Sequence, residues 1–266
     1  MKSTGGAVEK RHHMIAELVR TKGFVPIEHM ASEFGVTPQT IRRDINFLDE
    51  EGVLRRYHGG AGVALSTENV AYTRRKVLHL PEKQRIARLA AAKIPNHASL
   101  FISIGTTTEE VAKALYQHRG LKVITNNLNV ASILYGNKGF EVILAGGMVR
   151  RRDGGIIGPL TIDFIQQFRV DYGVIGISGI DLDGTLLDYD YREVRAARAI
   201  IDNSRRVFMV TDHTKFGRNA MVRLGSINEI DALFTDRRPP QPLDETIKVA
   251  EMDLYVTRGE GDQVIL

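Results

Sequence analysis

Hydrophobic residues between positions 38 and 51 recur with the spacing of a helix that is buried along one narrow face. These residues are Ile41, Ile45 and Leu48, at positions i, i+4 and i+7 of a single apolar stripe. Thr37 can cap this helix, because its hydroxyl can accept a hydrogen bond from an amide of the first turn. Pro38 fits the first helical position, where an N–H would have no helical partner. The pattern therefore predicts a helix that begins at Pro38 and ends just before Gly52.

The opposite side of this helix carries amide, hydroxyl and guanidinium groups. Its polar members are Gln39, Thr40, Arg42, Arg43 and Asn46. A helix that is packed on one side and carries such groups on the other suits the major groove of DNA. The alternative is an ordinary surface helix whose arginines are solvated. The segments on either side of the helix favour the first interpretation.

Two helices are predicted before this segment and a strand after it. The first helix covers 9–21, and the second buries an apolar face and ends at Gly35. The residues of that face are Ile27, Met30, Ala31 and Phe34. Only Gly35 and Val36 separate the second and third helices, which is the connection of a helix-turn-helix. A strand at 53–58 and the glycines that follow it complete the pattern of a winged helix.

This arrangement assigns eight residues to a DNA interface. Four of them are expected to face base edges, namely Gln39, Thr40, Arg42 and Arg43. The others are expected to hold phosphates, namely Thr37 in the helix and Arg55, Arg56 and His58 in the wing. Phosphate contacts position a protein on DNA but carry little sequence information. Residues 1–60 hold nine Lys and Arg against eight Asp and Glu, so strong non-specific binding is not expected from one copy.

From residue 100 onward, short apolar segments alternate with helix-like segments. The predicted strands are 100–104, 122–125, 141–144, 172–177, 207–210, 232–234 and 254–256. The predicted helices are 82–93, 109–117, 129–135, 160–168 and 191–203. Apolar strands that alternate with helices predict a parallel sheet covered on both faces. We therefore expect a winged helix-turn-helix domain at 1–65, a linker at 66–80 and a doubly wound α/β domain at 81–266.

Ligands of such a sheet bind beyond the carboxyl ends of its strands. After the first strand, residues 105–108 offer a tight turn, three hydroxyls and the amides of a helix N-terminus, which suit a phosphate. The candidates for the phosphate are Gly105, Thr106, Thr107, Thr108 and Lys215, and Asn126 and Asp153 are candidates for ligand hydroxyls. Gly146, Gly147 and Arg152 complete the expected pocket. Together these residues suit a small phosphorylated polyol.

Several of these residues also have a purely structural explanation. Thr106 and Glu109 have the spacing of a capping box, and Gly146 and Gly147 are compatible with a simple turn. The arginines at 150–152 are compatible with a solvated loop, Lys215 with a surface lysine, and the basic run at 74–76 with a solvated linker or a phosphate contact. Asp212 and His213 lie beside Lys215, but no ordering typical of a catalytic triad accompanies them.

Composition narrows the class of protein. The 266 residues are 43% hydrophobic and 26% charged, as in ordinary soluble globular proteins, and the net charge of +4 is compatible with a polyanionic partner. The chain has no cysteine, which excludes disulfides and thiolate metal sites. The eight histidines are scattered, so no metal site or cofactor is predicted. No apolar run reaches the roughly 18 residues of a membrane span, and a signal-peptide core is lacking. A cytoplasmic protein is expected.

The chain resembles the DeoR family of bacterial transcriptional repressors over about residues 9–238. The matching motifs in the first domain are Gln39-Thr-Ile-Arg-Arg-Asp44 and Leu54-x-Arg-x-His-Gly-Gly-Ala61. Those in the second are Ile104-Gly-Thr-Thr107, Thr125-Asn-Asn-Leu-Asn-Val-Ala131, Leu144-Ala-Gly-Gly147, Arg152-Asp-Gly-Gly-Ile-Ile-Gly158, Gly176-Ile-Ser-Gly-Ile-Asp181 and Lys215-Phe-Gly-Arg-Asn-Ala-Met-Val222. The last two favour the branch of the family that senses glycerol 3-phosphate.

The resemblance implies a sensor domain similar to ribose-5-phosphate isomerase, a homo-oligomer (dimer or tetramer), and release from double-stranded operator DNA when a sugar phosphate binds. We therefore expect a non-enzymatic repressor of glycerol metabolism genes that responds to glycerol 3-phosphate. One alternative is a repressor that senses another phosphorylated sugar, such as fructose 1-phosphate. Another is an isomerase whose general base is Asp181, Asp183 or Glu193. Residues 185–190 lack the lysine that follows the acidic loop of the isomerases, which counts against catalysis.

The resemblance has one departure in the DNA-binding domain. The second helix of the family usually begins with a Ser or Thr cap, whereas this chain has Pro26. The loss of such a cap costs about 0.5–2 kcal/mol. The fixed φ angle of proline is expected to recover part of this cost.

Overall fold

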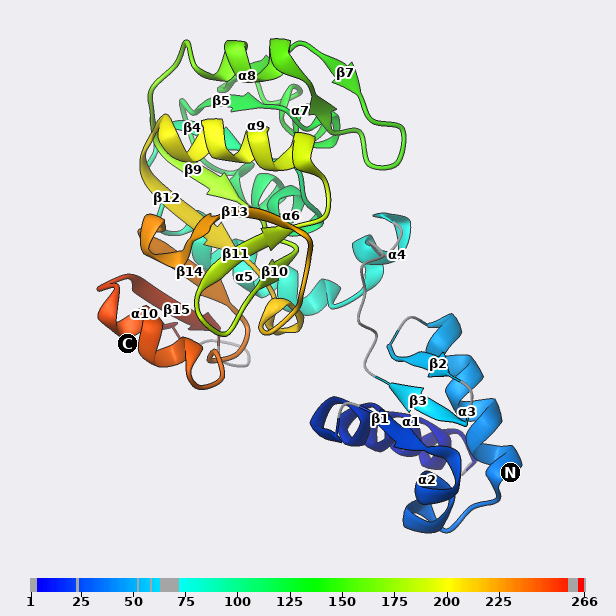
Figure 1. Cartoon of the computed structure of the whole chain (residues 1–266). Helices are drawn as coiled ribbons and strands as arrows, with labels where there is room; N and C mark the ends of the chain where they lie inside the picture. Colours follow the sequence, from blue (N-terminus) through cyan, green and yellow to red (C-terminus); the bar gives the residue numbers. More distant parts are fainter. Residues whose placement is uncertain are drawn as a thin grey trace. The chain divides into compact units, whose positions relative to one another are not determined.

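The computed structural model in Figure 1 describes residues 4–22, 24–51, 53–57, 59–62, 72–257 and 263–265. The chain divides into two compact units, Met1–Ser66 (unit one) and Thr67–Leu266 (unit two). His58 and the first part of the predicted linker lie outside the described residues.

Unit one is a winged helix, as the sequence predicts. Its helices are α1 (Thr4–Lys22), α2 (Ile27–Phe34) and α3 (Pro38–Glu50). Its strands are β1 (Phe24–Pro26), β2 (Arg55–Tyr57) and β3 (Gly60–Gly62), which form an antiparallel sheet in the order β1-β3-β2. The strand β1 was not predicted, because three residues between two helices give no periodic signal.

The ends of α2 and α3 follow from local chemistry. Gly35 closes α2 in the left-handed conformation at φ 62°, which a residue with a side chain rarely adopts. The Thr37 hydroxyl accepts a hydrogen bond from the amide of Thr40 at 3.2 Å, and Pro38 occupies the first turn of α3. Pro26 precedes α2 without a side-chain cap. These contacts confirm the predicted start of α3.

Asp44 fixes α3 against α1. Its carboxylate accepts a hydrogen bond from Arg11 Nε at 2.7 Å and lies 2.9 Å from His12 Nε2. Burial opposes the charge of Asp44, but the contacts with Arg11 and His12 outweigh burial and lower its pKa. Asp44 therefore holds the polar face of α3 in a fixed orientation.

Unit two contains an eight-stranded sheet in the order β16-β15-β14-β12-β9-β4-β5-β6, parallel except for β16. The strands are β4 (Ser99–Ile102), β5 (Lys122–Thr125), β6 (Glu141–Leu144), β9 (Val170–Ile175), β12 (Ser204–Val210), β14 (Ala232–Thr235), β15 (Asp253–Thr257) and β16 (Gln263–Ile265). The predicted parallel sheet is confirmed.

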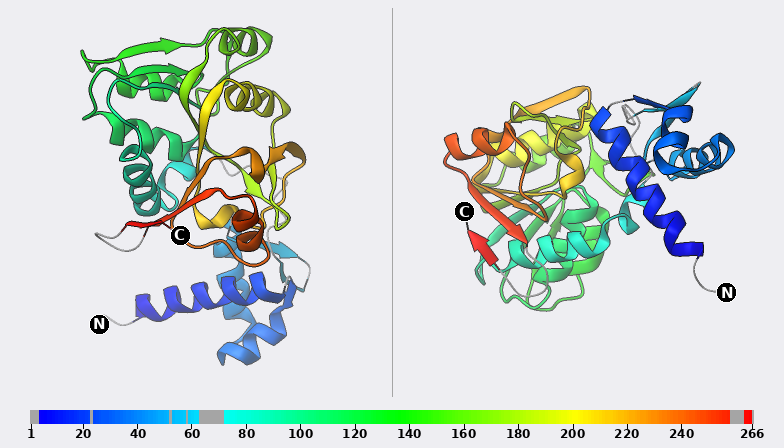
Figure 2. Two further views of the ribbon diagram at one scale, coloured as in Figure 1. Left: turned by 90° about the vertical axis from the view of Figure 1, so that its left-hand side faces the viewer. Right: turned by 90° about the horizontal axis from the view of Figure 1, so that it is seen from below.

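Helices cover both faces of this sheet (Figures 1 and 2). One face packs on α5 (Leu80–Ala91), α6 (Thr106–Leu115) and α7 (Leu128–Leu134), and the other on α8 (Pro159–Ile165), α9 (Tyr191–Asp202) and α10 (Leu243–Val249). In β4, Leu100 and Ile102 point into the first core and Phe101 into the second. The alternation is the two-residue period of a strand that is buried on both sides.

The order of the strands locates the expected ligand site. After β4 the chain forms β5 and β6 on one side, and it then returns to place β9 on the other side of β4. The strand order therefore reverses between β4 and β9. In open α/β sheets, ligands bind in the crevice outside the carboxyl ends of the strands at such a point.

Short elements of unit two were not predicted. They are α10 and β16, the hairpin β7 (Met148–Val149) and β8 (Ile156–Ile157), the small sheet β10 (Gly179–Ile180), β11 (Thr185–Asp188) and β13 (Val222–Ser226), and the 3-10 helices η1 (His213–Lys215) and η2 (Ile227–Glu229). A further helix, α4 (Tyr72–Val77), lies within the predicted linker 66–80. Six residues give too short a pattern to recognise, and contacts with α6 hold this helix in place.

None of the helices that the structure describes has the length and apolar character required to cross a bilayer.

Candidate functional site

Three polar side chains on the exposed side of α3 have no partner in the described part of the chain, whereas Thr40 and Asn46 are engaged. The side chains of Gln39, Arg42 and Arg43 are exposed, and none of them makes a hydrogen bond or ion pair with another described residue. The Thr40 hydroxyl lies 2.9 Å from that of Thr37, so these two side chains are partly engaged in capping the helix. The amide and guanidinium groups predicted to read bases are thus available to a partner.

The wing is joined to α3 by Arg56. Its Nη1 donates to Asn46 Oδ1 at 2.7 Å, and its backbone N–H donates to Asp49 Oδ1 at 3.2 Å. Arg55 lies in β2, with its backbone opposite Gly62, and His58 lies outside the described residues. The structure therefore brings one of the predicted wing residues to the helix predicted to enter the groove.

Residues 105–108 begin α6 at the carboxyl end of β4. The N-cap is Gly105, so the predicted capping box of Thr106 and Glu109 is wrong. Glu109 instead accepts hydrogen bonds from the hydroxyl of Tyr72, at 2.7 and 2.8 Å, and the Thr108 hydroxyl donates to the carbonyls of Ser103 and Gly105. Thr106 and Thr107 are buried on the same first turn. A side chain at position 105 would approach Thr108 Oγ1 to 3.1 Å, which favours glycine there.

Asn126 follows β5 and has an unpartnered oxygen. The side chain is 2% exposed, and its Nδ2 donates to the carbonyl of Ile156 at 3.1 Å. Its Oδ1 has no hydrogen-bond partner among the described residues. Because buried polar atoms are nearly always paired, this oxygen is a candidate acceptor for a ligand hydroxyl.

Gly146 and Gly147 lie in an exposed turn between β6 and β7. The Thr161 hydroxyl of α8 donates to the carbonyl of Gly146 at 2.8 Å. A Cβ atom at Gly147, which has φ 143°, would collide with the same hydroxyl. Close packing against α8 therefore accounts for Gly147 without a ligand.

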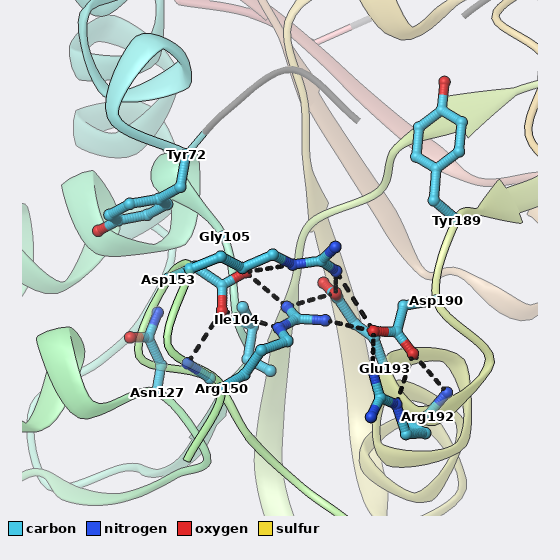
Figure 3. Close-up of polar contacts among 12 residues, drawn as sticks. Tyr72, Ile104, Gly105, Asn127, Arg150, Asp153, Tyr189, Asp190, Arg192 and Glu193 are labelled. Carbon is cyan, nitrogen blue, oxygen red and sulfur yellow. Dashed lines mark hydrogen bonds and ion pairs between the residues drawn. The ribbon is translucent and has the colours of Figure 1, made fainter. Parts of the chain in front are cut away.

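A buried network holds Arg150 (Figure 3). Arg150 Nε and Nη2 bind the two oxygens of Asp153 at 2.8 and 2.6 Å. Nη1 reaches Asp190 at 2.9 Å, and Nη2 also reaches Glu193 at 2.6 Å. Arg152 is 43% exposed and lies 3.3 Å from Asp190. The structure thus places Arg152 and Asp153, both predicted to bind the effector, in ion pairs with neighbouring side chains, whereas Arg151 is exposed.

Burial and neighbouring charges together shift the pKa values of the groups in this network. Burial disfavours the Arg150 cation, but Glu193 and Asp153 outweigh it and raise the pKa of Arg150. Burial, together with the nearby Asp188, raises the pKa of Glu193 to about 7. Burial also opposes the charge of Asp190, but hydrogen bonds from Arg192 and Arg150 lower its pKa. Arg150 is thus the central charge of a fully engaged cluster, and we assign it a structural role.

Replacing Arg150 by Met is expected to destabilise unit two strongly. The change leaves Asp153, Asp190 and Glu193 without their shared cation, and removing one partner of a buried ion pair typically costs about 3–5 kcal/mol. Urea denaturation followed by circular dichroism measures the loss. The matched control is Arg151→Met at the exposed neighbour, which is expected to change the free energy of unfolding by less than about 0.5 kcal/mol. Equal stability of the two variants would contradict the structural role.

Lys215 lies in η1, directly after β12, and is half-buried. Its Nζ makes no hydrogen bond and no ion pair within 4.0 Å of a described residue. Burial lowers the pKa of Lys215 to about 8, against an opposing contribution from Asp212. Asp212 itself bonds Thr214, and its pKa is lowered because Lys215 and Thr214 outweigh its burial. Lys215 is therefore a poorly neutralised cation at the carboxyl end of a central strand.

Sequence reasoning missed three side chains of this region, Tyr72 and Arg75 of α4 and Lys83 of α5. Tyr72 bonds Glu109, and the Lys83 ammonium donates to the carbonyl of Arg75. Three consecutive basic residues at 74–76 give no indication that Arg75 in particular is largely buried. The packing of α4 on α6 accounts for the burial of Arg75.

The three carboxylates considered as isomerase bases have structural partners. Asp181 Oδ1 accepts from the amide of Leu182 and Asp183 Oδ1 from that of Thr185, both within the turn between β10 and β11. Glu193 pairs with Arg150. The geometry therefore gives each of them a role in a turn or in the buried network.

Comparison with known proteins gives consistent matches along the chain. A model described as the DeoR-like helix-turn-helix domain matches residues 11–67, and one described as the DeoR C terminal sensor domain matches residues 78–237. The glycerol-3-phosphate regulon repressor of Escherichia coli (strain K12) is 55% identical over 231 residues, 87% of this chain and 92% of that protein. The protein of the same name from Haemophilus influenzae is 51% identical over 86% of this chain and 89% of its own. Among solved structures, ribose 5-phosphate isomerase from Plasmodium falciparum is 11% identical, with a TM-score of 0.41 over 69% of this chain and 97% of its own.

Proposed function

Because this chain belongs to the DeoR family, we propose that it represses genes of glycerol and glycerol-3-phosphate metabolism and leaves its operator when glycerol 3-phosphate binds. The two relatives named above cover the same two domains, which supports the transfer of their regulon to this chain. The proposed repressor is a cytoplasmic homo-oligomer that carries out no enzymatic step.

The DNA-binding half of the proposal is supported by α3. Its exposed Gln39, Arg42 and Arg43 present donors and acceptors that match base edges in the major groove. We propose that Thr40 joins them, and that Thr37, Arg55, Arg56 and His58 hold backbone phosphates. Such phosphate contacts fix the register of the helix on the duplex.

The observation that carries the sensing half is Lys215, which lies beyond the carboxyl end of β12. It is a half-buried cation with no hydrogen bond or ion pair to any residue that the structure describes. We propose that its ammonium and the first turn of α6, at 105–108, hold the phosphate of the effector. The unpartnered oxygen of Asn126 would accept a hydrogen bond from an effector hydroxyl. A phosphate and a few hydroxyls on a short carbon chain describe glycerol 3-phosphate, and fructose 1-phosphate shares these groups.

A binding experiment on the purified full chain tests this function. A duplex from the promoter region of the glycerol genes is expected to bind more tightly than a scrambled duplex, and glycerol 3-phosphate is expected to weaken operator binding about 5–150-fold, the usual range for coupled sites. Glycerol, inorganic phosphate and fructose 1-phosphate serve as controls in the same titration. Equal binding to both duplexes would contradict the repressor, and release by fructose 1-phosphate alone would contradict the choice of effector.

A further inference from the structure

Three basic side chains of unit two are placed where burial disfavours their charged forms. They come from different elements, Arg75 from α4, Lys83 from α5 and Lys215 from η1. Arg75 and Lys83 both disfavour the charged form of Lys215, and Arg75 disfavours that of Lys83. Elements distant in the chain thus bring positive charges together, at an energetic cost to the free protein.

Arg75 lacks a full set of acceptors. Its side chain is 19% exposed, and its Nη2 lies 3.9 Å from Asp153, a carboxylate that Arg150 already binds at 2.6 and 2.8 Å. The Nε atom of Arg75 is buried and has no hydrogen-bond partner among the described residues. Burial lowers the pKa of Arg75 despite the nearby Glu193 and Asp153. A further acceptor would satisfy this side chain.

Lys83 is also buried without a carboxylate in ion-pair contact within the described part of the chain. The residue is 4% exposed, and its ammonium donates to the backbone carbonyl of Arg75. Asp212 is the largest favourable charge on both Lys83 and Lys215. Because the single carboxylate of Asp212 is shared by the two ammonium groups, a further anion would be attracted to them.

We propose that Arg75 and Lys83 bind the phosphate of the effector together with Lys215, so that α4 forms one wall of the sensing site. A guanidinium supplies paired donors that match phosphate oxygens, and lysines supply compact positive charges. The proposal rests on the proposed function, and it adds two phosphate-binding residues that lie outside the loops at the ends of the strands. Arg150 is not included, because the acidic network already balances its charge.

Tyr72 positions this wall. Its hydroxyl donates to the Glu109 carboxylate of α6 at 2.7 Å and accepts a hydrogen bond from Asn129 Nδ2 at 3.0 Å. The helix that carries Arg75 is therefore docked on α6, the helix that begins at Gly105. In chain order, α4 is also the first described helix after unit one, so an effector that binds Arg75 acts on the segment that follows the DNA-binding unit.

The test compares Arg75→Met with the matched control Lys138→Met, which removes a charge from an exposed position of the same unit. Isothermal titration calorimetry with glycerol 3-phosphate and with inorganic phosphate is expected to show at least a tenfold loss of affinity for Arg75→Met and less than a twofold change for the control. Operator binding is expected to persist in both variants. Without ligand, Arg75→Met is expected to melt no lower than the wild type, because the variant removes an incompletely paired buried cation.

The changes in effector affinity and in melting temperature together distinguish a residue that binds the effector from one that only stabilises the fold. Weaker effector binding with undiminished thermal stability supports the proposal. Unchanged affinity, or a loss of affinity accompanied by a clearly lower melting temperature, overturns it. If the wild type binds none of the phosphorylated polyols, the proposed function fails and the inference fails with it; if the wild type responds and Arg75→Met responds equally, only the inference fails.

Discussion

The Lys215→Met variant is expected to bind operator DNA like the wild type and to remain bound when glycerol 3-phosphate is added. Lys215 is the half-buried cation on which the proposed sensing site depends. Removing one partner of a buried charged pair typically costs about 2–5 kcal/mol in binding. At 1.4 kcal/mol per factor of ten, this is a loss of at least about 30-fold in effector affinity. Operator release measured by fluorescence anisotropy and effector affinity measured by calorimetry check both parts.

The pH dependence of effector binding adds a second test of Lys215. The pKa of its ammonium is about 8 in the free protein, where burial, Arg218, Arg75 and Lys83 disfavour the charge and Asp212 favours it. A bound phosphate favours the ammonium, so the affinity falls as the pH rises above about 8. The second pKa of a phosphate monoester is about 6, so the affinity also falls below that value. We therefore expect a maximum between about pH 6 and pH 8.

Two substitutions serve as controls for this interpretation. Lys215→Arg keeps a positive charge at all accessible pH values, so its affinity is expected to stay level above pH 8 where that of the wild type declines. Lys138→Met removes a charge from an exposed position of the same unit and is expected to leave release unchanged. Normal induction of Lys215→Met, or the same loss in Lys138→Met, would exclude Lys215 from the site.

Much of the fold follows from the periodicity of apolar residues. The strands β5 and β6 begin and end where the sequence predicts, because short apolar runs bounded by polar residues give a sharp signal. The same signal locates β4, β9 and β12 to within a few residues. Elements of two or three residues, such as β7 and β8, give no comparable pattern. They form because the folded sheet brings their partners together.

The candidate site was less predictable, because its side chains are arranged by contacts between distant segments. Arg150, Arg151 and Arg152 are alike in sequence. Arg150 is buried against Asp190 and Glu193, about forty residues away, whereas Arg152 reaches Asp190 from an exposed position and Arg151 is exposed. The spacing of Thr106 and Glu109 suggests a capping box, but the Glu109 carboxylate accepts its hydrogen bonds from Tyr72 of α4 instead. The spacing of residues in the sequence thus identifies the loops of the candidate site. Contacts between distant segments decide which side chains of these loops remain free to bind an effector.

Arg43→Ala is expected to lose much of the preference of the protein for its operator. Arg43 is exposed on the polar face of α3 and has no partner among the described residues, so its guanidinium is free to bind a base edge. A good bidentate contact to a base contributes about 1–3 kcal/mol of discrimination. For one bound DNA-binding domain, this corresponds to a change of about 5–150-fold in the ratio of operator affinity to scrambled-duplex affinity. Alanine favours the helix, so α3 is expected to stay folded.

Arg56→Ala is the informative comparison, because Arg56 is proposed to bind phosphate rather than bases. Its loss is expected to weaken binding to both duplexes by a similar factor and to reduce the dependence of affinity on salt concentration. The Arg56 guanidinium also holds Asn46 of α3, so the melting temperature of each variant is measured beside its affinity. If Arg43→Ala keeps the wild-type ratio between operator and scrambled duplex while remaining folded, Arg43 does not read bases. The specificity of α3 would then have to come from Gln39, Thr40 or Arg42.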